Sequence, residues 1–240
     1  MMIRPFEILG KTKAFFVGPP LEEGPFPTLI YFALSAEDSL QCDPFNQPVQ
    51  FLEGLPLRIF SITLPGHENN LPPENALNIW EERMRKGDPV IPPFIDSVQE
   101  ILESLQPHIL DKRLAVAGLS RGAYIACHVA AVCPNISTIL GFAPLTQFRV
   151  ARHLDLETLI PHLYNRAIRF YIGNHDTRVG TEHAFSFISK LAAEAHKNRI
   201  RSSPIELLIG PSIGYKGHGT SPEIFKAGAE WIKGALLNEL

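Results

Sequence analysis

The stretch "RLAVAGLSRGAYIACHVAAV", residues 113–132, decides the fold. An apolar run leads into "GLSRG" (118–122), and small apolar residues in a helical pattern follow at once. A sharp turn from a strand into a helix crowds the positions two before and two after its centre, so both must be glycine or similarly small. The pattern therefore predicts a strand, a tight turn and a helix, with Ser120 exposed at the helix N-terminus.

Strand-like and helix-like segments alternate along the chain. The strand-like runs are 13–17, 28–34, 57–64, 113–118, 138–143, 168–173 and 205–210. The amphipathic helical patterns are 92–106, 181–198 and 221–237. Several of the strand-like runs lack period-two alternation, which is typical of strands covered on both faces. The sequence therefore predicts an α/β fold with a mostly parallel sheet of about eight strands and helices on both faces.

Residues 1–240 are expected to form a single domain, because no repeat or long linker divides them. No helical pattern separates the two segments within about 5–17, which predicts an antiparallel hairpin at the sheet edge. The segment 145–165 is longer than a simple crossover needs. We interpret it either as a small cap near the strand ends or as an ordinary amphipathic crossover helix.

The overall composition is that of a globular protein, and it narrows the possible partners. The hydrophobic fraction is 45%, the charged fraction is 20% and the formal net charge is −3. A nucleic-acid partner is not expected, because the chain has no large basic excess. The first residues lack an apolar core behind a basic tip, and three cysteines with no paired spacing suggest no disulfide scaffold. We therefore expect no membrane insertion, a cytoplasmic location and a small-molecule partner, and leave the oligomeric state open.

Two further residues are candidates to act with Ser120. A serine hydroxyl is a weak nucleophile at neutral pH, so it needs a base, and that base needs an orienting acid. Asp176 follows the predicted strand 168–173, and His218 stands between two glycines after the predicted strand 205–210. Parallel strands end at one edge of the sheet, so the three side chains are predicted to meet there. Their chain order, Ser then Asp then His, is also the one expected for a nucleophile at such a turn.

Other residues could compete for these roles. Asp155, after the preceding strand, is the main rival for the acid. His175 adjoins Asp176 too closely to be the base, and His67 is interpreted as structural or pocket-lining. The remaining histidines lie in helical patterns or in the segment 145–165, where surface or core roles are expected; they are His108, His128, His153, His162, His183 and His196.

These motifs resemble those of the α/β-hydrolase superfamily. "GNHDTRVG" (173–180) and "GYKGHG" (214–219) are similar to the catalytic ends of its prolyl-oligopeptidase-like and dienelactone-hydrolase-like branches. The resemblance implies a serine hydrolase that uses no metal or cofactor. It also implies that Ser120 is the nucleophile, His218 the general base and then acid, and Asp176 the orienting carboxylate.

The substrate is left open by this resemblance. A small carboxylic ester or thioester is the first expectation. The alternatives are a serine peptidase of the prolyl-oligopeptidase type and a non-catalytic binding protein on the same fold. No dinucleotide fingerprint, Walker loop or H-E-x-x-H motif occurs, and His175 with Asp176 is too small a group for a metal site.

The sequence departs from the resemblance at the predicted oxyanion hole. Many members have His-Gly after the third strand, whereas this chain has "IYFALSAEDS" (30–39). The Arg121 amide is the expected first donor, and Leu34 or Ser35 the expected second. A backbone donor does not depend on its side chain, so the hole can survive the change.

Four arginines raise the possibility of an anionic substrate; they are Arg121, Arg149, Arg152 and Arg178. Guanidinium groups that face a pocket bind carboxylate or phosphate well. The competing interpretation is that Arg121 only pairs across the turn and that the arginines of 145–165 are solvated. Arg178 and Phe148 are the candidate substrate-binding residues.

Overall fold

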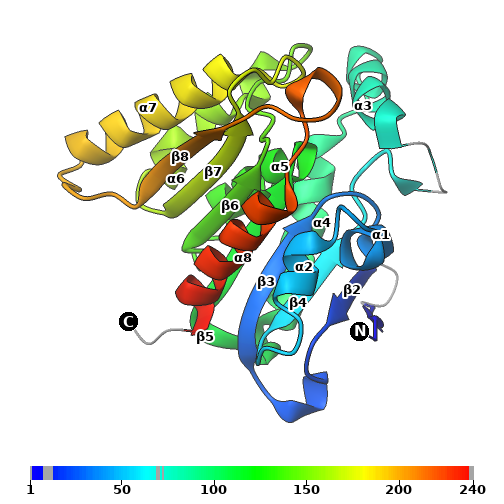
Figure 1. The fold of residues 1–240 in the computed structure, drawn as a ribbon. Coiled ribbons are helices and arrows are strands. Elements are labelled where there is room, and N and C mark those ends of the chain that lie inside the picture. Colours follow the sequence, from blue (N-terminus) through cyan, green and yellow to red (C-terminus); the bar gives the residue numbers. More distant parts are fainter. Residues whose placement is uncertain (1, 8–12, 69–70, 72, 238–240) are drawn as a thin grey trace.

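The structure is a computed structural model, and it describes residues 2–7, 13–68, 71 and 73–237. Within these residues eight strands form one sheet in the order β1-β2-β4-β3-β5-β6-β7-β8 (Figure 1). Their bounds are β1 Arg4–Phe6, β2 Ala14–Val17, β3 Phe26–Phe32, β4 Arg58–Ile62, β5 Ile109–Leu119, β6 Thr138–Phe142, β7 Ala167–Gly173 and β8 Ile205–Gly210. The pairs β1–β2 and β2–β4 are antiparallel, and the other pairs are parallel. The predicted sheet and edge hairpin are confirmed, although residues 8–12 between β1 and β2 lie outside the described part.

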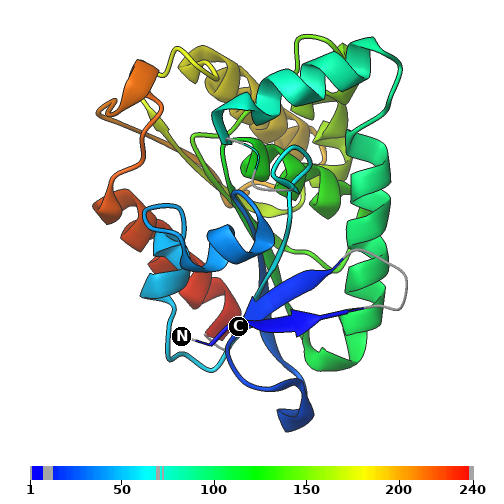
Figure 2. The same ribbon diagram turned by 90° about the vertical axis from the view of Figure 1, so that its right-hand side faces the viewer.

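Helices cover both faces of this sheet, as predicted (Figures 1 and 2). Their bounds are α1 Ala36–Gln41, α2 Gln47–Phe51, α3 Ala76–Arg85, α4 Ile91–Leu105, α5 Arg121–Val132, α6 Ile160–Leu163, α7 Thr181–Lys197 and α8 Pro222–Leu237. On one face, Val98 of α4 and Phe187 of α7 belong to one buried cluster. On the other face, Val49 of α2 and Ile232 of α8 belong to a second. Burying one apolar stripe of each helix against the sheet is the main favourable contribution to this fold.

The topology brings three loops to one edge of the sheet. β5, β6, β7 and β8 run parallel, and the last residues of β7 and β8, Gly173 and Gly210, are register partners. The loops that follow β5, β7 and β8 therefore emerge side by side. They carry Ser120, Asp176 and His218.

The segment 145–165 combines features of both of its interpretations. It contains two short 3-10 helices, Arg152–Leu154 and Leu156–Leu159, followed by the one-turn α6. Leu156 and Leu163 are buried, and α6 packs against both α5 and α7. Residues 147–149 and 152 instead border a cavity at the carboxyl edge of the sheet. The segment thus completes a helical layer and also shapes the rim of the site.

His128 of α5 predicts a pH dependence of stability. Its Nε2 lies 3.0 Å from the Leu154 carbonyl oxygen, to which the neutral ring donates, and burial lowers its pKa to about 4. The unfolded chain binds a proton near pH 6.5, while the folded chain does not until about pH 4, so stability falls as pH drops through this window. We expect this residue to cost up to about 3 kcal/mol of unfolding free energy at the acid end.

Urea unfolding of wild type and His128→Gln at pH 7, 5.5 and 4.5 checks this expectation. Glutamine can still donate to Leu154 but does not titrate, so the stability of the variant should fall less steeply with acid. Other buried groups, such as His67, contribute equally to both proteins. Identical losses in the two proteins would contradict the assignment.

Candidate active site

Ser120 occupies the sharp turn between β5 and α5 predicted from "GLSRG". Its backbone has φ 56° and ψ −113°, a conformation that is unfavourable for a residue other than glycine. A Cβ on Gly118 would overlap the backbone of Gly122, and a Cβ on Gly122 would overlap the Phe32 carbonyl oxygen. Glycine is therefore required at both positions: at Gly118 by the crowding within the turn expected from the sequence, and at Gly122 by the neighbouring strand β3.

His218 lies between Ser120 and Asp176. Its Nε2 is 2.9 Å from Ser120 Oγ, and its Nδ1 is 2.7 Å from Asp176 Oδ2. With the ring proton on Nδ1, the imidazole donates to the carboxylate and accepts from the serine hydroxyl. The side chains of His218 and Asp176 are 9% and 0% exposed, so the pair is shielded from water. The structure thus brings together the three residues selected from the sequence.

Backbone amides hold the Asp176 carboxylate. Its Oδ1 accepts hydrogen bonds from the amides of Arg178 at 2.9 Å and Val179 at 3.1 Å. The Asp176 amide donates to Thr181 Oγ1, and that hydroxyl donates in turn to the Gly173 carbonyl at the end of β7. One carboxylate oxygen is therefore fixed by the loop, and the other faces His218.

The loop that carries His218 is fastened to the loop that carries Asp176. The Thr177 amide and hydroxyl both donate to the Lys216 carbonyl, at 3.0 and 3.2 Å. The His175 amide donates to Ser212 Oγ at 2.6 Å. Gly217 has φ +73°, and a Cβ there would overlap the His175 carbonyl oxygen. The glycines around His218 did predict a close approach to another backbone, but the Thr177 and Ser212 contacts have no signature in the sequence.

The oxyanion hole differs from the sequence prediction. Arg121 is the first residue of α5, where unpaired helix amides favour negative charge, so its amide stays the predicted first donor. Leu34 borders the opening beside Ser120, but its amide donates to Ser39 Oγ at 2.9 Å. Ser35 caps α1, and its Oγ accepts from the Asp38 amide at 3.1 Å. In this conformation the Leu34 amide is engaged by Ser39, while the Ser35 amide stays a predicted second donor.

The Arg121 side chain is buried beneath the site. Its Nη2 lies 2.9 Å from His67 Nε2, and its guanidinium lies 5.8 Å from the centre of the Trp80 ring. Burial, and then the nearby Arg178, lower the pKa of Arg121 to about 10; burial, and then Arg121, lower the pKa of His67 to about 4. At neutral pH Arg121 is therefore charged and donates to a neutral His67. The two residues form a buried polar pair beside Trp80.

Asp155, the rival acid, is engaged elsewhere. Its Oδ1 accepts from the Phe148 amide at 2.6 Å, and its Oδ2 lies 3.1 Å from Arg152 Nη1. It therefore stabilises the turn after β6, while the carboxylate that faces His218 is that of Asp176.

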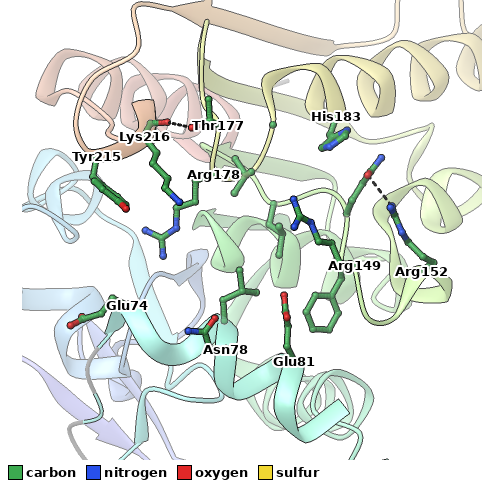
Figure 3. Close-up of a pocket in the computed structure, with 16 residues that line it drawn as sticks. Glu74, Asn78, Glu81, Arg149, Arg152, Thr177, Arg178, His183, Tyr215 and Lys216 are labelled. Atoms are coloured by element: carbon green, nitrogen blue, oxygen red, sulfur yellow. Dashed lines mark hydrogen bonds between the residues drawn. The ribbon is translucent and has the colours of Figure 1, made fainter. Parts of the chain in front are cut away.

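Two adjoining cavities lie at this edge of the sheet. The first, of about 420 Å³, is bordered by Ser120 and His218. The second, of about 770 Å³, lies between α3, the turn after β6 and the loop after β7 (Figure 3). Glu74, Arg178 and Tyr215 border both. Arg178 therefore lines the same cavity as Ser120, as the substrate-binding prediction requires.

Phe148, the other predicted substrate-binding residue, lines only the second cavity. It is 1% exposed, because it packs against Trp80 and Tyr124. Its position is that of a cavity wall. Its contribution to substrate binding stays a prediction.

The described residues contain neither a candidate metal site nor a candidate membrane span. Among those residues, no group of three or more His, Cys, Asp and Glu side chains could hold a metal ion. None of the described helices is both long enough and apolar enough to cross a bilayer.

Comparisons with known proteins identify the fold. No protein-family model matches the chain, and no curated protein matches it in sequence. A cold-adapted esterase from an Arctic intertidal metagenomic library is similar in structure, with TM-score 0.71, 17% identity, and coverage of 98% of this chain and 93% of that one. Est1E from Butyrivibrio proteoclasticus has TM-score 0.63 and 13% identity, with coverage of 98% and 99%. An acylaminoacyl peptidase from Pyrococcus horikoshii has TM-score 0.66 and 13% identity, and the match covers all of this chain but 42% of that one.

These similarities, together with the sheet order and the sharp turn at Ser120, show that the chain has the α/β-hydrolase fold. The resemblance of the sequence motifs to that superfamily is confirmed at the level of fold.

Proposed function

We propose that this protein is a serine hydrolase that cleaves a small carboxylic ester or thioester through an acyl-enzyme. The observation that carries the proposal is the single imidazole of His218, which spans from Ser120 Oγ at 2.9 Å to Asp176 Oδ2 at 2.7 Å. This arrangement matches a nucleophile, its base and the acid that orients the base.

In the proposed reaction, Ser120 Oγ attacks the carbonyl carbon while His218 Nε2 takes the hydroxyl proton. The Asp176 carboxylate stabilises the resulting imidazolium. Negative charge develops on the carbonyl oxygen, near the N-terminus of α5 and the Arg121 amide. When the tetrahedral intermediate collapses, His218 gives its proton to the leaving alcohol or thiol. Water then attacks the acyl-serine, with His218 again as base, and the acid and free serine are released.

The esterases among the similar structures support the choice of an ester substrate. Est1E and the metagenomic esterase match this chain over more than nine-tenths of their own lengths. The chain spans about two-fifths of the matched acylaminoacyl peptidase. The alternative of a prolyl-oligopeptidase-type peptidase is supported by that match and by the motifs of the Asp176 and His218 loops.

A panel of substrates tests the proposal. The expected result is turnover of p-nitrophenyl acetate and butyrate, or of the matching acyl thioesters, and little turnover of a blocked dipeptide p-nitroanilide. Faster cleavage of the anilide than of the esters would support the peptidase alternative. A folded protein that turns over none of them would support the non-catalytic binding alternative and overturn the proposal.

A further inference from the structure

The larger cavity beside the serine carries an excess of positive charge. Its charged side chains are Arg149, Arg152, Arg178, Lys216, Glu74 and Glu81. Two of these already have partners nearby, since Arg152 pairs with Asp155 and Glu81 pairs with Arg85. The remaining three cations face one carboxylate, which leaves a net charge of about +2 in the cavity.

The three remaining cations outnumber the one remaining carboxylate of the cavity, Glu74. Among the described residues, no ion pair engages Arg149, Arg178 or Lys216. Figure 3 shows that Arg178 extends inward from the loop after β7 and that Arg149 extends inward from the turn after β6. Glu74, Asn78 and Glu81 line the opposite wall (Figure 3). Two guanidinium groups from separate loops thus enter one cavity.

Arg178 connects the positively charged cavity to the cavity that contains Ser120. It borders both cavities, and it is close enough to the buried Arg121 to lower the pKa of that residue. Like charges so close together destabilise each other, and a bound anion would offset that repulsion. A group held at Arg178 would therefore be part of a molecule that also reaches Ser120.

The apolar residues that line the cavity indicate that the ligand also has an apolar part. Leu77, Leu145, Phe148 and Val179 supply apolar surface next to the cations. A pocket of this kind suits an organic anion, because apolar contacts hold the body while charged groups fix its orientation.

We propose that this cavity binds an anionic group, a carboxylate or a phosphate, that is part of the ester substrate, with Arg178 and Arg149 as its ligands. The proposal rests on the proposed hydrolase function, since it names the substrate class of the same site. Guanidinium groups bind either anion through paired hydrogen bonds. Arg178 and Arg149 then determine specificity, while Ser120 and His218 carry the reaction.

Isosteric pairs of esters test this substrate class. One pair, 4-acetoxybenzoate and 4-acetoxybenzamide, has the charge on the leaving group. The other pair, the p-nitrophenyl esters of 4-carboxybenzoic and 4-carbamoylbenzoic acid, has it on the acyl group. In at least one pair we expect wild type to prefer the carboxylate about tenfold to a hundredfold in kcat/KM, after correction for hydroxide-catalysed rates.

The variants Arg178→Gln, Arg149→Gln and their combination should reduce this preference about tenfold or more. Arg201→Gln is the matched control, because Arg201 is exposed and lies in a turn beyond α7, and it should leave the preference unchanged. A ratio near one in both wild-type pairs, or a ratio that the double variant retains, would overturn the proposal. Thermal melting of each variant excludes loss of fold as the cause.

A binding measurement separates this proposal from the proposed function. Calorimetry with Ser120→Ala uses 4-acetamidobenzoate, 4-acetamidophenyl phosphate and the neutral 4-acetamidobenzamide. We expect at least one anion to bind tenfold or more tightly than the amide, with an affinity that falls as salt rises, and the tighter anion identifies the group. Equal binding of all three, beside turnover of neutral esters by wild type, would overturn the anion site and leave the hydrolase standing. Selective anion binding without turnover of any ester would overturn the hydrolase function and support the anion site.

Discussion

Replacing Ser120 with alanine is expected to lower ester turnover by about 10⁵- to 10⁶-fold, to near the uncatalysed rate. The Oγ that lies 2.9 Å from His218 Nε2 is the atom that forms the acyl bond in the proposed reaction, and alanine has no substitute for it. The change removes one atom at a position whose φ of 56° is equally unfavourable for both residues, so the fold should persist.

The measurement is kcat/KM for p-nitrophenyl butyrate, with thermal melting as the check on folding. Ser104→Ala is the matched control, because Ser104 is exposed on α4 and donates only to the Glu100 carbonyl within its own helix. It should retain wild-type turnover. Activity of Ser120→Ala within tenfold of wild type would contradict the assignment of the nucleophile.

Asp176→Asn is expected to lower kcat by about 10⁴-fold while leaving the protein folded. The amides of Arg178 and Val179 donate to Oδ1, so the variant amide will turn its carbonyl oxygen towards them. Its NH₂ then faces His218 Nδ1, and the ring proton must move to Nε2. In that tautomer the ring cannot accept the Ser120 proton.

Asp155→Asn is the matched control, because it changes the rival carboxylate in the same way. Asp155 supports the Phe148 amide and Arg152, so this variant should affect local stability more than kcat. The expected loss of kcat is less than tenfold. The opposite ranking of the two variants would indicate that Asp155 is the acid and that the observed Asp176 contact has another role.

Much of the site could be predicted because its signals are local. The glycines around Ser120 are required by contacts within one turn and with the adjacent strand, and such a turn has a recognisable pattern. Asp176 and His218 could be found because each follows a long apolar strand, and parallel strands deliver their next loops to one edge. The apolar run before Asp176 becomes the largely buried strand β7, and the run before His218 becomes the partly exposed edge strand β8.

The rest depends on contacts that leave no recognisable pattern in the sequence. The Leu34 amide was predicted to face the serine, but the hydroxyl of Ser39, five residues further on, accepts it. The buried partner of Arg121 is His67, which is 54 residues away in a stretch with no clear periodicity. The helix α3 was missed for a related reason, because its only buried residues are Ala76 and Trp80, too few for a recognisable apolar stripe.

The same limit applies to the charged cavity. The sequence shows where the arginines are, but it does not distinguish an arginine exposed to solvent from one that enters a pocket. Only the spatial arrangement brings Arg149, Arg178 and Lys216 to one cavity and pairs Arg152 with Asp155. The residues proposed to determine specificity are therefore harder to predict from the sequence than the residues proposed to carry the reaction.

Covalent labelling with a fluorophosphonate tests the central claim most directly, because the reagent reacts with a serine only when an adjacent base activates it. The account predicts one adduct per chain, located by peptide mass spectrometry on Ser120, with no adduct on Ser120→Ala and strongly slowed labelling of Asp176→Asn. An unlabelled but folded wild-type protein, or an adduct on a different residue, would contradict it.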